Sequence, residues 1–131
     1  MQPIRIAVGD LTLDGELNDT EGARRLARVL PMTSGFQVWG DEIHFEVPVE
    51  PLADRRAQES ASVGDLGLCA GEATLCIFFG PTPSSPAEEP VPARPVTIVG
   101  SVRSAERLRG VKAADQISLA PATEKAVNGD D

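Results

Sequence analysis

Apolar and polar residues alternate along several short segments of this chain, and turn residues separate the segments. The first segment places Ile4, Ile6 and Val8 at every second position, and a Gly-Asp pair follows it. This period-2 pattern predicts a strand with one buried face, and the turn predicts an antiparallel hairpin with residues 11–17. Further strands are predicted by the same signals over 36–39, 43–47, 65–69, 74–79, 96–102 and 117–119.

Only one segment has the periodicity of a helix of several turns. Its apolar residues fall on one stripe, and Pro31 ends it; they are Ala23, Leu26, Ala27 and Leu30. Asn18 is the predicted N-cap, with Glu21 three residues later as in a capping box. A single helical turn is also predicted over 104–110.

These elements predict a mainly β domain. The chain has 131 residues, of which 41% are hydrophobic, enough for one domain with a core. About eight short strands, joined mostly by hairpins, are typical of a sandwich or a barrel. We expect the domain to span residues 1–120 and residues 121–131 to form a C-terminal tail.

The charge and the ends of the chain restrict its partners. A net charge of −8 argues against nucleic acid, whose binding needs clustered Lys and Arg. No secretory signal pattern opens the chain, and no apolar run approaches the roughly 20 residues of a membrane span. We therefore expect no membrane association and a cytoplasmic location. No phosphate loop, dinucleotide fingerprint or zinc-ligand cluster is evident, so no cofactor is predicted.

The two cysteines are Cys69 and Cys76. If residues 70–73 form a hairpin loop, both thiols lie on one face as diagonal neighbours, roughly 7 Å apart at the backbone. That separation is at the limit for an unstrained disulfide, so buried free thiols are the preferred prediction.

The single histidine, His44, has a glutamate two residues before it and another two residues after it. Glu42, His44 and Glu46 are predicted to share one strand face. Same-face neighbours stand roughly 6.6 Å apart along a strand, which is too far for one ion to bind all three. A polar face turned to solvent is the preferred interpretation, and no metal site is predicted. His44 is a candidate general base, although no nucleophile lies beside it in the sequence.

Three stretches together resemble the small prokaryotic cyclophilin-like proteins, a family mostly without an assigned activity. They are residues 39–45, residues 64–67 leading into 75–83, and residues 96–102. The resemblance runs from about Ile4 to Leu119. It implies a closed, eight-stranded antiparallel β-barrel, with one helix after the first hairpin and a short second helix.

True cyclophilins are peptidyl-prolyl isomerases, and the resemblance to them is incomplete. Phe78-Phe79 is similar to the end of their Gln-Phe-Phe strand, but Ile77 stands in place of the Gln. Their Phe-His-Arg strand is matched here by a His at position 44 without the Arg. An isomerase needs a donor near the prolyl nitrogen. Arg55 or Arg56 could supply this donor, so whether the chain is an enzyme stays open.

Three functions follow as hypotheses. The preferred one is a domain that binds a small molecule or an extended peptide in an aromatic groove, without the isomerase chemistry of true cyclophilins. Its predicted wall is Trp39, His44, Phe78, Phe79 and Thr82. Trp39 could instead plug an end of the barrel.

The first alternative is a weak prolyl isomerase that uses His44 with Arg55 or Arg56. The second is a structural or assembly module, with the Pro-rich residues 80–95 as a lid, an interface or a plain crossover. The oligomeric state stays open.

Overall fold

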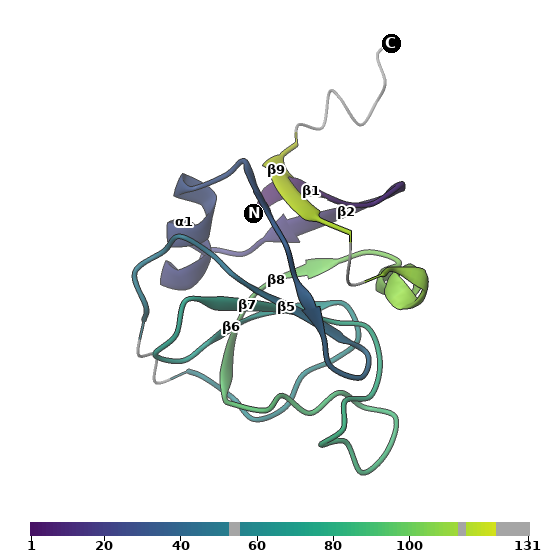
Figure 1. The fold of residues 1–131 in the computed structure, drawn as a ribbon. Coiled ribbons are helices and arrows are strands. Elements are labelled where there is room, and N and C mark those ends of the chain that lie inside the picture. The colour runs from purple at the N-terminus through teal and green to yellow at the C-terminus, as the bar shows by residue number, and fades with distance from the viewer. Residues whose placement is uncertain (53–55, 113–114, 123–131) are drawn as a thin grey trace.

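A computed structural model of the protein describes residues 1–52, 56–112 and 115–122 (Figure 1). The described part of the chain contains nine strands, one α-helix and one 3₁₀ helix. The elements are β1 (Gln2–Val8), β2 (Leu11–Leu17), α1 (Glu21–Arg28), β3 (Met32–Ser34), β4 (Gln37–Val38), β5 (Glu42–Glu46), β6 (Asp65–Cys69), β7 (Thr74–Phe78), β8 (Val96–Val102), η1 (Ala105–Gly110) and β9 (Ile117–Pro121). No described helix is both long and apolar enough to cross a membrane.

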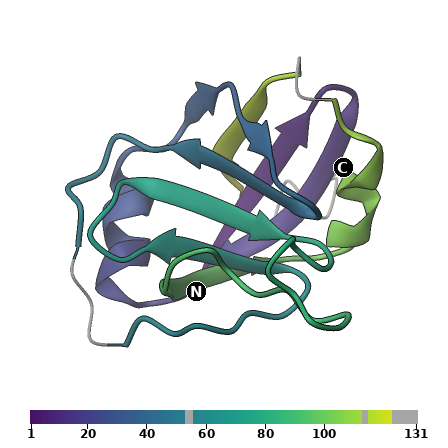
Figure 2. The ribbon, with the colours of Figure 1, turned by 60° about the horizontal axis from the view of Figure 1, so that its bottom comes forward.

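All nine strands belong to one antiparallel sheet, which curves into an open half-barrel (Figure 2). The strand order is β3-β9-β1-β2-β8-β6-β7-β5-β4. The predicted mainly β fold is confirmed, but the predicted closed barrel of eight strands is wrong. The two edge strands, β3 and β4, are separated by Gly35 and Phe36 alone, and the described sheet contains no pairing between them. Strand β3, which pairs with β9, was not predicted because three residues show no readable period.

Helix α1 forms where predicted, but a different residue caps it. Thr20 is the N-cap, and its side chain accepts a hydrogen bond from the Ala23 amide at 3.2 Å. Asn18 instead accepts a hydrogen bond from the Thr20 hydroxyl at 2.7 Å, which holds the Thr20 side chain in its capping position. Glu21 forms an ion pair with Arg25 rather than a capping box. The Asn18 prediction was wrong because Asn18, Asp19 and Thr20 are all residue types that can serve as a cap.

The apolar residues form two clusters on opposite faces of the sheet. The first fills the half-barrel and contains Ile4, Ile6, Leu26 and Phe36 among others. The second is smaller and contains Ala61, Cys69, Cys76, Phe78 and Val96. Strand β7 contributes to both clusters, so it has buried apolar residues on both faces. The second cluster forms the floor of the site described below.

The last strand is longer than predicted. Pro121 pairs with Ile4, and the Ala122 amide donates to the carbonyl oxygen of Pro3 at 3.0 Å. Residues 123–131 of the predicted tail lie outside the described residues. The domain boundary at residue 120 stays a prediction.

Candidate functional site

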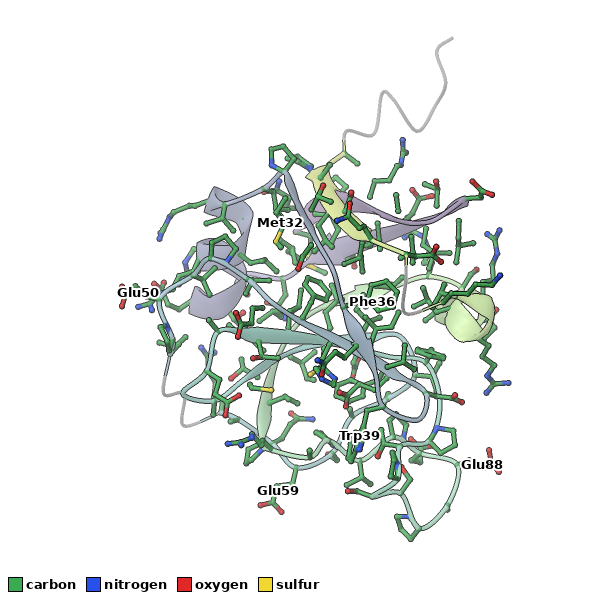
Figure 3. All side chains as sticks on the ribbon, viewed as in Figure 1. Met32, Phe36, Trp39, Glu50, Glu59 and Glu88 are labelled. Atoms are coloured by element: carbon green, nitrogen blue, oxygen red, sulfur yellow. The ribbon has the colours of Figure 1, made fainter. Side chains whose placement is uncertain are left out.

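A pocket of about 370 Å³ opens on the face of the sheet that carries the second cluster. Strands β5, β6 and β7 contribute to its wall, together with Val96 of β8 and residues 92–94. The lining residues are Trp39, Glu42, His44, Cys69, Glu72, Thr74, Cys76, Pro92, Ala93, Arg94 and Val96. Figure 3 shows Trp39 toward the loop that carries Glu88, whereas Phe36 lies toward β9. The pocket is therefore separate from the main core, to which Phe36 belongs.

Glu42 is a buried carboxyl group within this pocket, with a residue exposure of 4%. Its Oε2 lies 3.0 Å from His44 Nδ1, and His44 Nε2 lies 3.2 Å from Gln37 Oε1. Its other oxygen, Oε1, is buried and makes no hydrogen bond in the described part of the chain. A buried polar atom without a partner is uncommon in a folded protein. Glu42 therefore holds one carboxyl oxygen ready for a donor.

The predicted polar row of Glu42, His44 and Glu46 is thus wrong for Glu42. The three side chains do share one face of β5, but burial falls along it from Glu42 through half-buried His44 to exposed Glu46. Residues 92–94 and the β6–β7 hairpin line the same pocket as Glu42, whereas Glu46 lies outside that lining. A period of two identifies the face of a strand, but it does not say which chain segment crosses that face.

Burial is the main influence on the Glu42 carboxyl, and it raises the pKa of this group. The His44 ring and the Cys76 thiol act in the opposite direction, by charge and by hydrogen bonding. The raised pKa means that the folded protein resists placing an unpaired negative charge here. A cation or an N–H donor at Oε1 would remove that resistance.

We expect Glu42→Gln to stabilise the domain progressively as the pH rises. Below the ordinary value of 4.5 the carboxyl is neutral in both states. Between that value and the raised pKa, the folded wild type keeps a proton that the unfolded chain loses, so its free energy of unfolding falls. Above the raised pKa the folded wild type carries the full cost of the ionised, buried Glu42 carboxyl. The Gln variant has no charge at this position and carries no such cost.

Urea unfolding of both proteins between about pH 4 and pH 8 measures this difference. Burial also raises the pKa of Asp65. This group is present in both proteins, so its effect cancels in the difference between their free energies of unfolding. A stability difference that is constant with pH, or that shrinks as pH rises, would contradict the raised pKa of Glu42.

Two free thiols stand beside Glu42. Cys69 Sγ and Cys76 Sγ are 3.8 Å apart, and both residues are buried. Cys76 pairs with Gly67 on one side and with His44 on the other, so the predicted diagonal arrangement of the thiols is confirmed. The Cys76 thiol lowers the pKa of Cys69 by hydrogen bonding. The pKa of Cys76 is raised by that same contact, by burial and by Glu42. The two directions favour Cys69 over Cys76 as the thiolate of the pair.

A charged pair lies at the mouth of the pocket. Arg94 Nη1 is 2.6 Å from Glu72 Oε2, and the two side chains are 65% and 36% exposed. Glu72 belongs to the β6–β7 turn, and Arg94 to the segment before β8. Such an exposed pair contributes little to stability, about 0–1 kcal/mol, so it can open at small cost.

The structure brings together only part of the predicted wall. Trp39 and His44 line the pocket. Phe78 and Phe79 are 0% and 3% exposed and lie outside its lining, in the second and first clusters respectively. Of the predicted catalytic arginines, Arg56 is exposed and absent from the lining, and Arg55 lies outside the described residues.

Thr82, the last predicted wall residue, is buried within the loop that follows β7. Its Oγ1 donates to the carbonyl oxygen of Val91 at 2.6 Å, and its amide donates to Ser85 Oγ at 2.9 Å. The Val91 amide also donates to Ser85 Oγ, at 3.1 Å. These bonds join the two ends of residues 82–91, directly before the segment that lines the pocket.

We expect Thr82→Val to cost about 1–3 kcal/mol of stability, because it removes the hydroxyl that satisfies the Val91 carbonyl. Hydrogen exchange should quicken at Val91 and at nearby amides. Ser84→Ala, which removes an exposed hydroxyl from the same loop, is the control and should change neither quantity. Unchanged exchange at Val91 in Thr82→Val would show that this bond does not hold the loop.

Sequence reasoning missed Glu42, Arg94 and the two thiols as pocket residues. The sequence did contain a signal for Glu42 and Cys76. Glu42 shares a face of β5 with His44, and Cys76 shares a face of β7 with Phe78, and both partners were predicted site residues. Arg94 carried no signal, because it follows a Pro-rich stretch without periodicity. Among the described residues, no three potential ligands gather in a way that would hold a metal ion.

This architecture, an open antiparallel half-barrel with a short helix across one end, defines a cyclophilin-like domain. The cyclophilin-like family matches residues 2–120, and the chain belongs to this family. No curated protein matches the sequence.

Two solved structures are similar to this one. The solution structure of the hypothetical protein AF2241 from Archaeoglobus fulgidus has a TM-score of 0.78 and 27% identity, and the match covers 92% of this chain and 95% of that one. The structure of McbB in complex with tryptophan has a TM-score of 0.59 and 17% identity, over 89% of this chain and 44% of that one. The second likeness is one of fold alone. The family and these relatives assign no activity to the chain.

Proposed function

We propose that this domain binds a small ligand with an apolar body and a cationic or N–H donor group, which donates to Glu42. The observation that carries the proposal is Oε1 of Glu42, which is buried without a hydrogen-bond partner. Leaving such an oxygen unpaired costs about 1–3 kcal/mol, and more when it is charged. A donor from a ligand would recover that free energy on binding.

The rest of the pocket supports an apolar ligand body. Trp39, Pro92 and Val96 offer apolar surface, and small ligand sites typically combine such walls with a few polar groups. The net charge of −8 also favours the approach of cations over anions. The pocket volume of about 370 Å³ suits a small ligand better than an extended peptide.

The two alternatives receive less support. A prolyl isomerase of the cyclophilin kind would use an exposed aromatic pair, and Phe78 and Phe79 are both buried. An assembly module would use the sheet edge at β4, where Val38 is 44% exposed, but this strand has only two residues. Both alternatives stay hypotheses, and the experiment below also tests the isomerase.

Benzylamine is a suitable probe, with benzoate as its anionic counterpart. Trp39 is the only tryptophan, so one indole N–H resonance reports the pocket directly. We expect benzylamine to shift this resonance in a saturable way, with a Kd of about 1 mM for a ligand this small. Benzoate should not bind, and Glu42→Gln should weaken benzylamine by roughly tenfold or more.

Glu46→Gln is the matched control. It removes the same charge from the same strand, but at an exposed position outside the pocket lining. Equal affinity of the wild type and Glu42→Gln for benzylamine, or no binding at all, would overturn the proposal. If an Ala-Pro-Phe peptide shifts Trp39 instead and its cis/trans exchange becomes faster, the isomerase alternative would replace it.

A further inference from the structure

We propose that Cys69 and Cys76 form a thiol–disulfide exchange site for small disulfides, in which Cys69 attacks and Cys76 resolves. The site shares the pocket with the proposed ligand function but does not depend on it. It rests on three positions: two thiols 3.8 Å apart, both on the pocket wall, and the buried Glu42 carboxyl beside one of them.

The position of each thiol in the fold sets its role. Cys69 is the last residue of β6, next to the turn whose Glu72 pairs with Arg94 at the mouth. Cys76 lies in the middle of β7, between β6 and β5, and faces His44 across the ladder. A disulfide that enters through the mouth therefore meets Cys69 first. The lowered pKa of Cys69 and the raised pKa of Cys76 agree with this order.

The chemistry needs one disulfide, RS–SR, and no other reactant. The Cys69 thiolate attacks one sulfur, the S–S bond of the reagent breaks, and RS⁻ leaves, so that Cys69 carries a mixed disulfide. The Cys76 thiol then passes its proton to Glu42, and its sulfur attacks Cys69 Sγ. A bond forms between the two protein sulfurs while the second RS⁻ leaves and takes up a proton. Two protein thiols are oxidised, and one disulfide is reduced to two thiols.

The internal disulfide should be easy to reduce. The two sulfurs must approach from 3.8 Å to about 2.05 Å, and the residues are diagonal neighbours rather than a directly opposed pair. Closing that distance strains β6 and β7. Strained disulfides have high reduction potentials and belong to the labile class. A small thiol such as 2-mercaptoethanol should therefore restore both cysteines in the folded protein.

The test treats the folded chain with bis(2-hydroxyethyl) disulfide, which is neutral and does not need Glu42 for binding. Samples are quenched in acid, the remaining thiols are labelled with N-ethylmaleimide, and the intact mass is measured. We expect the wild type to lose two hydrogen atoms, retain no reagent and take no label. Cys76→Ala should stop at a mixed disulfide on Cys69. Cys69→Ala should react roughly tenfold more slowly or worse.

The Glu42→Gln variant tests whether Glu42 accepts the Cys76 proton or is only a structural neighbour of the thiols. The first step should be no slower in this variant, because the Glu42 charge raises the pKa of Cys69, while the mixed disulfide accumulates because the second step slows. Glu46→Gln should behave as the wild type does. Peptide mapping of the short-lived adduct in the wild type, which should fall on Cys69, keeps the proposal testable even if a cysteine variant fails to fold.

Three results would overturn the proposal. They are a folded wild type that does not react while the urea-unfolded chain does, a wild type that keeps the reagent, and an adduct that maps to Cys76. Because the reagent is neutral, failure of benzylamine to bind would leave this result untouched.

Discussion

Phe78→Ala is expected to destabilise the folded domain by about 3–5 kcal/mol. The side chain is fully buried in the second cluster, against Cys69, Cys76 and Val96. Its removal leaves a cavity that strands β6, β7 and β8 cannot close, because each strand is held on both sides by its neighbours in the sheet. Urea unfolding followed by far-ultraviolet circular dichroism measures the loss.

Trp39→Ala is the comparison, because sequence reasoning placed Trp39 and Phe78 in one wall. Trp39 is half-buried at the pocket and belongs to neither cluster, so its removal should cost about 1 kcal/mol. It should nevertheless weaken benzylamine binding, since it removes apolar wall. A Phe78→Ala protein as stable as the wild type would show that Phe78 is not the buried support described above.

Gly100→Ala is the second change with a large expected effect, a loss of about 3 kcal/mol. Gly100 pairs with Leu17 where β8 meets β2. A Cβ atom there would lie 2.2 Å from the carbonyl oxygen of Glu16 and 3.1 Å from Leu17 Cα. Both contacts are with backbone, so the clash can be relieved only by moving the two strands apart. That movement breaks the link between the N-terminal hairpin and the rest of the sheet.

Gly35→Ala is the matched control for this prediction. Gly35 lies between β3 and β4, where an added Cβ meets nothing within 4 Å. We expect its stability to stay within about 0.5 kcal/mol of the wild type. If Gly100→Ala and Gly35→Ala unfold at the same urea concentration, the close approach of β2 and β8 would be contradicted.

The strands of this domain could be predicted from the sequence because their pattern is local. Alternation at Ile4, Ile6 and Val8 and the apolar run of β7 each determine a strand within a few residues. Helix α1 follows from a stripe of period 3.6, although it ends at Arg28, before Leu30 of the predicted stripe. The match over residues 2–120 confirms the family resemblance, but the closed eight-stranded barrel that the resemblance implied is wrong.

The openness of the barrel and the burial of Glu42 could not be predicted in this way. Whether β3 pairs with β4 depends on the curvature of the whole sheet, and no short segment records it. Glu42 lines a pocket whose other residues include Pro92, Ala93 and Arg94, at a sequence distance of about 50 residues. A glutamate between Asp41 and Ile43 looks the same in sequence whether other residues cover it or water does.

The crystal structure of the protein with benzylamine tests the central claim most directly. The account predicts one benzylamine in the pocket, with its ammonium nitrogen about 3 Å from Oε1 of Glu42 and its ring against Trp39 and Val96. An empty pocket at saturating benzylamine, or a ligand whose nitrogen points away from Glu42, would contradict it.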